Sequence, residues 1–171
     1  MKERPILFSG EMVRAILDGR KAQTRRTVKG SIVVGDPYCP PCPYGAQGCR
    51  LWVRETFAYT DQHINYEPGW VYRATDPDWS EMEGFKWKPS IFMPRAASRI
   101  TLEVERISVE RLQDITEEDA RAEGVTVSKS IASDRVWPQY KDAYKVLWES
   151  INGEGSWAKN PWVWVVEFKK L

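Results

Sequence analysis

A lysine and a threonine three positions apart, Lys21 and Thr24, are the residues of this chain best suited to chemistry. They lie in the stretch Gly-Arg-Lys-Ala-Gln-Thr-Arg-Arg, which spans residues 19–26. A threonine hydroxyl becomes a nucleophile when a neighbouring base removes its proton, and a lysine is such a base when its amine is neutral. Nearby positive charges and partial burial would lower the pKa of Lys21 toward neutrality. The stretch therefore fits nucleophilic catalysis, and it also fits a solvated basic edge strand that discourages aggregation.

A helix before this stretch and a strand after it would hold the two side chains in place. Apolar residues from Met12 to Leu17 follow helical spacing, and Gly19 permits a left-handed cap at the end of the helix. Thr24 then lies just inside a strand, with Lys21 on the connecting turn. Because successive residues of a strand point to opposite faces, the two side chains converge only if the turn or a bulge intervenes.

A second short helix offers a carboxylate. Thr116 is the expected N-cap, and Asp119 three residues later forms an approximate capping box with it. Gly124 ends this helix, so Glu123 lies in its last turn. The negative end of a helix disfavours a carboxylate. Glu123 is therefore either tolerated at the surface or retained for a task.

The rest of the pattern is that of a mixed α+β domain. A further helix is predicted over residues 136–151, and strands are predicted over residues 5–8, 51–57, 71–74, 99–109 and 162–168. The alternation changes phase near Arg106, which indicates a bulge. The last strand is apolar on both faces, which is typical of a central strand. With no regular βαβ alternation, we expect a small mixed or closed sheet.

We expect one domain over residues 1–171, with a loop-rich insertion at about residues 35–98. A chain of 171 residues is long enough for one full core. Four prolines between positions 37 and 43 exclude regular structure there. Long ordered loops in compact domains usually carry function or clamp a site.

Three cysteines, Cys39, Cys42 and Cys49, lie in this insertion. The first two have the Cys-x-x-Cys spacing of zinc sites, but a structural zinc needs four ligands. The fourth would have to be His63, the only histidine, or a carboxylate. Because no second pair of ligands is present, we expect free thiols in a proline-stiffened loop, with no metal and no cofactor.

The charge distribution points to an anionic partner rather than to a membrane. The net charge is only +1, yet residues 1–30 hold eight lysines and arginines against three acidic residues. Such a local excess fits the attraction of phosphates, and it also fits chance, because windows of 30 residues often deviate by several charges. No apolar run approaches the roughly 20 residues that a bilayer requires, and the beginning of the chain is unlike a secretory signal. We expect a cytoplasmic protein without membrane contact.

These motifs resemble those of the ASCH domain family. The resemblance rests on Gly-Arg-Lys-x-x-Thr-x-Arg, on the Ile-Thr-Glu helix that ends at Glu123, and on the closing Val-Glu-Phe-Lys of residues 166–169. Leu-Trp-Val-Arg-Glu-Thr, Met-Pro-Arg-x-Ala-Ser-Arg-Ile and Asn-Pro-Trp-Val-Trp-Val-Val-Glu-Phe narrow it to ASCH proteins of phages and prophages. The resemblance implies a PUA-like small β-barrel of mixed strands with short flanking helices, related to an RNA-binding fold.

One bacterial branch of that family is an amidohydrolase that acts on N(4)-acetylcytidine. Resemblance to this branch implies that Lys21 is the general base, Thr24 the nucleophile and Glu123 the proton donor. Attack on the acyl carbonyl would give an acyl-threonine, which water then hydrolyses. The chain departs from the branch at residues 22, 23 and 25, where it has Ala, Gln and Arg. It is also far longer.

The alternatives to a hydrolase are an RNA- or DNA-binding module, a ribonuclease and a phage accessory protein. In the binding module, aromatic residues would stack on bases. The residues expected at a substrate or nucleic-acid surface, besides Lys21, are Arg20, Arg25, Arg26, Arg54 and Glu55. The expected partner is thus a modified nucleoside or an RNA, and the sequence leaves the oligomeric state open.

Overall fold

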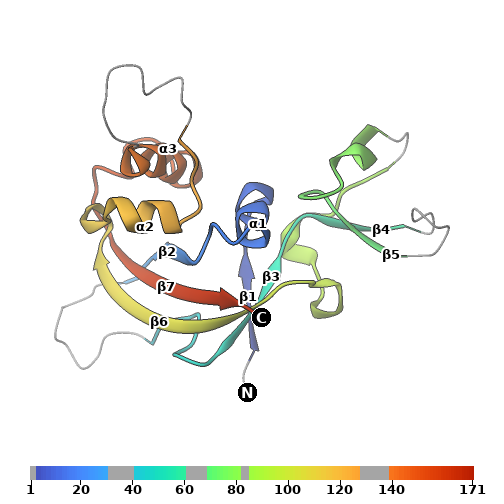
Figure 1. Cartoon of the computed structure of the whole chain (residues 1–171), viewed down its shortest axis with the longest axis horizontal. Coiled ribbons are helices and arrows are strands. Elements are labelled where there is room, and N and C mark those ends of the chain that lie inside the picture. The colour runs from blue at the N-terminus through green and yellow to red at the C-terminus, as the bar shows by residue number, and fades with distance from the viewer. Residues whose placement is uncertain (1–2, 31–40, 61–68, 82–84, 128–138) are drawn as a thin grey trace.

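The computed structural model describes residues 3–30, 41–60, 69–81, 85–127 and 139–171. Within these ranges, five strands form one mixed sheet in the order β1-β3-β6-β7-β2 (Figure 1). The strands are β1 (Glu3–Leu7), β2 (Gln23–Thr27), β3 (Arg50–Arg54), β6 (Thr101–Arg111) and β7 (Trp162–Lys170). β1 pairs in parallel with β3, and the other three pairings are antiparallel.

The sheet has two edges instead of the closed barrel that the sequence led us to expect. β1 and β2 are the edge strands, and no backbone ladder joins them within the described residues. A side chain bridges this seam: Arg26 Nη2 donates a hydrogen bond of 2.7 Å to the carbonyl oxygen of Leu7. β1 stops at Leu7 because the chain turns directly into a helix, so too little strand remains for closure. The α+β class is confirmed, and the closed barrel is wrong.

In the described part of the chain, three α-helices flank the sheet: α1 (Gly10–Leu17), α2 (Glu117–Ala122) and α3 (Tyr140–Asn152). α2 and α3 contact each other and lie together over one end of β6 and β7, while α1 lies nearer β1 (Figure 1). The predicted helices are confirmed, although residues 136–138 lie outside the described part. No helix in the described ranges is both long and apolar enough to cross a bilayer.

β7 joins two hydrophobic cores, as its apolar sequence predicts. It lies between β6 and β2. Trp164, Val166 and Phe168 are buried in a core shared with α1, whereas Val163 and Val165 are buried in a core shared with α2 and α3. The strand thus fixes the position of all three helices relative to one another.

The predicted irregularity near Arg106 is also confirmed. The pairing of β6 with β7 shifts register between Val104 and Arg106. A bulge of this kind bends a strand and increases its twist. Figure 1 shows β6 and β7 as long curved strands that carry α2 and α3 at one end.

A second, two-stranded sheet lies across α1 from α2 and α3 (Figure 1). β4 (Phe57–Thr60) pairs antiparallel with β5 (Gly69–Tyr72). We expected one strand over residues 51–57, which is wrong, because the chain leaves the main sheet between β3 and β4. At this bend the buried carboxylate of Glu55 accepts two hydrogen bonds from Arg99, of 2.9 and 3.0 Å.

Candidate active site

The turn after Gly19 allows the side chains of Lys21 and Thr24 to line the same pocket. Gly19 has a φ of +73°, and the backbone amides of Arg20 and Lys21 both donate to the carbonyl of Ala15, at 2.8 and 3.0 Å. Lys21 then forms an isolated bridge with Glu123 before β2 begins. Lys21 therefore precedes the strand, and the alternation of the strand does not dictate where its side chain points.

The C-terminal end of α2 presses directly against this turn. The capping box of Thr116 and Asp119 is present, and Glu123 is the C-cap residue. Gly124 follows with a φ of +85°, and a Cβ atom there would lie 2.8 Å from Ala15 Cβ and 2.9 Å from Lys21 Cβ. Both the backbone conformation and the lack of space require glycine. This close approach brings the Glu123 carboxylate to the Lys21 amine.

Lys21 and Glu123 form a buried ion pair. Lys21 Nζ lies 2.8 Å from Glu123 Oε2, and the two residues are only 4% and 2% exposed. The same nitrogen also donates to the backbone carbonyls of Gln23 and Glu123, each at 2.8 Å. Three acceptors match the three protons of an ammonium group. Burial nevertheless lowers the pKa of Lys21, and the attraction of Glu123 only partly opposes this shift.

Arg25 holds the other side of the same carboxylate. Its buried guanidinium lies 3.3 Å from Glu123 Oε1, 2.6 Å from Glu110 Oε1 and 3.2 Å from Asp119 Oδ2. Glu110 comes from β6 and Asp119 from α2, so Arg25 ties three elements together. The sequence placed Arg25 at a phosphate-binding surface, but the structure turns it inward toward three carboxylates.

Tyr144 is a member of the site that the sequence did not reveal. It lies on α3, and its side chain is buried in the pocket that Glu123 also lines. Burial and the negative charge of Glu123 raise the pKa of Tyr144 well above its usual range. The phenol therefore stays protonated at neutral pH. Helical spacing can predict that a residue of this helix faces the core, but not that it lies beside a carboxylate that is distant in the sequence.

Lys21, Thr24 and Glu123 all line one pocket of about 320 Å³. This volume is near the lower end of the range of about 300–1,000 Å³ for small-molecule sites. Aromatic side chains form part of the wall. Phe8 comes from the segment between β1 and α1, and Tyr144 and Trp148 come from α3. Lys21 Nζ lies 5.5 Å from the centroid of the Phe8 ring. The pocket thus combines charged side chains with the flat surfaces of aromatic rings.

The remaining predicted surface residues lie at the rim of this pocket or away from it. Arg26 lines the pocket, whereas Arg54 does not line it and has its guanidinium 5.3 Å from the centroid of the Trp52 ring. Glu55 is bound to Arg99 and does not line the pocket. Arg20 lies outside it as well.

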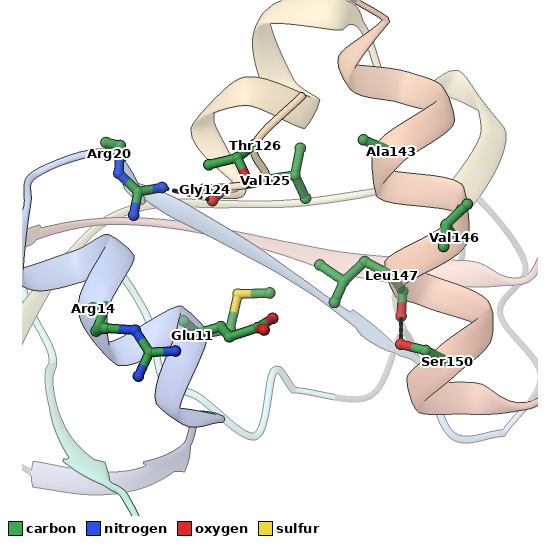
Figure 2. Close-up of a pocket in the computed structure, with 11 residues that line it drawn as sticks. Glu11, Arg14, Arg20, Gly124, Val125, Thr126, Ala143, Val146, Leu147 and Ser150 are labelled. Atoms are coloured by element: carbon green, nitrogen blue, oxygen red, sulfur yellow. Dashed lines mark hydrogen bonds between the residues drawn. The ribbon is translucent and has the colours of Figure 1, made fainter. Parts of the chain in front are cut away.

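Arg20 instead borders a second pocket, of about 450 Å³, between α1 and α3. Its guanidinium donates a hydrogen bond of 3.0 Å to the carbonyl oxygen of Gly124, which is marked by a dashed line in Figure 2. It also pairs with Asp18 at 2.9 Å, so its charge is already compensated. Arg14, on the same wall, donates to the carbonyl of Ala74, and Glu11 adds a negative charge beside it.

The cysteines give no support for a metal site. Cys42 is a buried thiol whose pKa is raised by burial, and Cys49 is a partly buried free thiol. Cys39 and His63 lie outside the described residues. Across the described ranges, no three His, Cys, Asp or Glu side chains form a group that could hold a metal ion.

Comparison with known proteins shows similarity of structure only. No protein-family model and no curated protein matches the chain. The ASCH domain from Lactobacillus crispatus is similar with a TM-score of 0.46 and 12% identity, over 99% of this chain and 79% of that one. Protein EF3133 from Enterococcus faecalis is similar with a TM-score of 0.46 and 9% identity, over 100% of this chain and 77% of that one. These values do not establish the family of this chain.

Proposed function

We propose that this protein is a hydrolase that removes an acyl group from the amino group of a modified nucleobase or nucleoside, such as N(4)-acetylcytidine. The observation that carries the proposal is the buried pair of Lys21 and Glu123, 2.8 Å apart, in a pocket that Thr24 also lines. Lys21 and Glu123 are 102 positions apart in the chain. They and Thr24 are the three residues that the resemblance to ASCH amidohydrolases implies.

Thr24 would attack the acyl carbonyl carbon through its Oγ1 atom. The hydroxyl proton passes to the neutral Nζ of Lys21, and a tetrahedral intermediate forms. The C–N bond then breaks, and the leaving nitrogen takes a proton from Glu123. Water attacks the resulting acyl-threonine ester, which releases a carboxylic acid and restores the Thr24 hydroxyl. The sum of these steps is the hydrolysis of one amide to one amine and one acid.

A proton transfer within the ion pair would prepare both catalysts at once. Moving one proton from Lys21 Nζ to Glu123 Oε2, across 2.8 Å, gives a neutral amine beside a carboxylic acid. Burial favours the neutral pair because desolvation penalises both charges. Arg25 opposes the transfer, since its guanidinium favours the carboxylate form of Glu123. The balance between burial and Arg25 would thus determine how often the site is ready for attack.

The test is the release of cytidine from N(4)-acetylcytidine by the purified protein. We expect turnover by the unaltered chain, partial turnover by Thr24→Ser, and none by Thr24→Ala or Lys21→Ala. Thr27→Ala is the matched control, because Thr27 lies on the same strand and at the same pocket but is exposed. Full turnover by Thr24→Ala would show that Thr24 is not the nucleophile. No turnover by the folded, unaltered chain would refute the hydrolase and favour non-catalytic binding.

A further inference from the structure

The charge of the catalytic pocket is not balanced. Among the described residues, its lining contains three cationic side chains, those of Lys21, Arg25 and Arg26, and one carboxylate, that of Glu123. Glu123 compensates Lys21, and Arg25 has further carboxylates behind it. The charge of Arg26 is left over, because no carboxylate among the described residues lies within salt-bridge distance of it.

Arg54 is a second arginine of this kind, and residues next to it line the pocket. Leu7 is its register partner across β1 and β3, and neighbouring strands lie about 4.8 Å apart. Arg26 donates to the carbonyl of the same Leu7. Arg54 donates to the carbonyl of Ile91, whose neighbour Ser90 lines the pocket. In the described part of the chain, Arg54 has no carboxylate partner either.

Arg26 lies at the less buried end of the pocket. Lys21, Thr24 and Glu123 are each less than 5% exposed, so they form the deep end. Arg26, Thr56 and Ser90 are half-buried and line the other end. An acylated base that enters amide first would place its sugar, and any group attached to that sugar, at this less buried end.

We propose that Arg26 and Arg54 form a subsite for a phosphate carried on the sugar of the substrate. Guanidinium groups bind phosphate through paired charge-assisted hydrogen bonds, and the hydroxyls of Thr56 and Ser90 supply further donors. The substrate is then a nucleotide or a nucleotide within a strand, in preference to a free nucleoside. This inference rests on the proposed function for the identity of the base, but the phosphate subsite can be tested without any hydrolysis.

Exposed apolar side chains beside Arg54 offer a way to distinguish a mononucleotide from a nucleotide within a strand. Ile91 and Phe92 are 57% and 67% exposed on the segment that Arg54 contacts. Proteins that bind single strands stack the bases on exposed aromatic rings and contact the phosphate backbone with positively charged side chains. If a strand is the natural substrate, Phe92→Ala weakens binding of a trinucleotide and leaves binding of a mononucleotide unchanged.

The experiment measures equilibrium binding of cytidine, cytidine 5′-monophosphate and a cytidine trinucleotide to the full chain, by calorimetry. None of these ligands carries an acyl group. We expect the monophosphate to bind at least about tenfold more tightly than cytidine, and Arg54→Gln to remove most of that difference. Arg106→Gln is the control, since Arg106 is an exposed arginine of β6 whose carboxylate contact is 3.9 Å long. The difference should also shrink as salt rises.

The outcomes separate the two proposals. Equal binding of cytidine and its monophosphate, or a phosphate preference that survives in both Arg26→Gln and Arg54→Gln, would overturn the subsite even if N(4)-acetylcytidine is hydrolysed. A phosphate preference that both variants lose supports the subsite even if no acylated substrate is hydrolysed. Circular dichroism of each variant verifies that it is folded.

Discussion

Substitution of Glu123 by glutamine should destabilise the protein strongly, because it leaves the Lys21 ammonium without its counterion. At a separation of 2.8 Å and an effective dielectric constant of about 20, the attraction between the two charges is about 6 kcal/mol. The cost of burying both charges offsets much of this. Removing one partner of such a buried pair costs about 3–5 kcal/mol. A domain of this size has a stability of about 5–15 kcal/mol, so we expect Glu123→Gln to fold but to melt at a lower temperature.

A double-mutant cycle isolates the contribution of the pair. Urea unfolding at pH 7, followed by tryptophan fluorescence, gives the free energies of unfolding of Lys21→Met, Glu123→Gln and the double variant. Direct contacts give coupling energies of about 0.5–3 kcal/mol, and we expect a value in the upper half of that range. Asp18→Asn is the control, because its exposed ion pair with Arg20 should contribute at most about 1 kcal/mol. Additive losses for Lys21 and Glu123 would refute the buried pair.

Three further predictions concern the same site. Burial lowers the pKa of Lys21, so just below pH 10.5 the unfolded chain binds more protons than the folded chain. The stability of the unaltered chain should therefore rise relative to that of Lys21→Met as pH increases from 7 to 10. A constant difference in melting temperature would contradict this. Gly124→Ala should destabilise more than Gly19→Ala in urea unfolding, since both have positive φ but only Gly124 lacks space for a Cβ; equal losses would argue against the close approach. Because burial and the charge of Glu123 raise the pKa of Tyr144, its phenol should not ionise in the folded protein up to about pH 10.5, so Tyr144→Phe should leave the ultraviolet titration of the tyrosines below that pH unchanged; the loss of one titrating phenol in the variant would contradict this.

Local signals predicted the parts of the site that depend on neighbouring residues. The glycine after α1 gave the turn, and the Thr116–Asp119 capping box gave the start of α2. The apolar closing strand gave the centre of the sheet. Each of these features is encoded within a few residues, so spacing and residue type were sufficient.

Features that depend on distant partners could not be predicted in this way. Arg25 looked like a phosphate ligand because its carboxylate partner Glu110 is 85 positions away. The bend at Glu55 was missed because Arg99, which binds its carboxylate, is 44 positions away. Closure of the sheet depends on whether its edge strands meet, and strand alternation carries no information about that. Side-chain alternation gives two faces, but the partners decide which face is buried.

The most direct test of the account is a search for the acyl-enzyme. The protein is mixed with N(4)-acetylcytidine, quenched in acid within the first turnovers, digested and analysed by mass spectrometry. The account predicts that one acetyl group is attached to Thr24, and that Lys21→Ala prevents its formation. Release of cytidine without acetylation of Thr24, or acetylation at another residue, would contradict the assignment of Thr24 as the nucleophile.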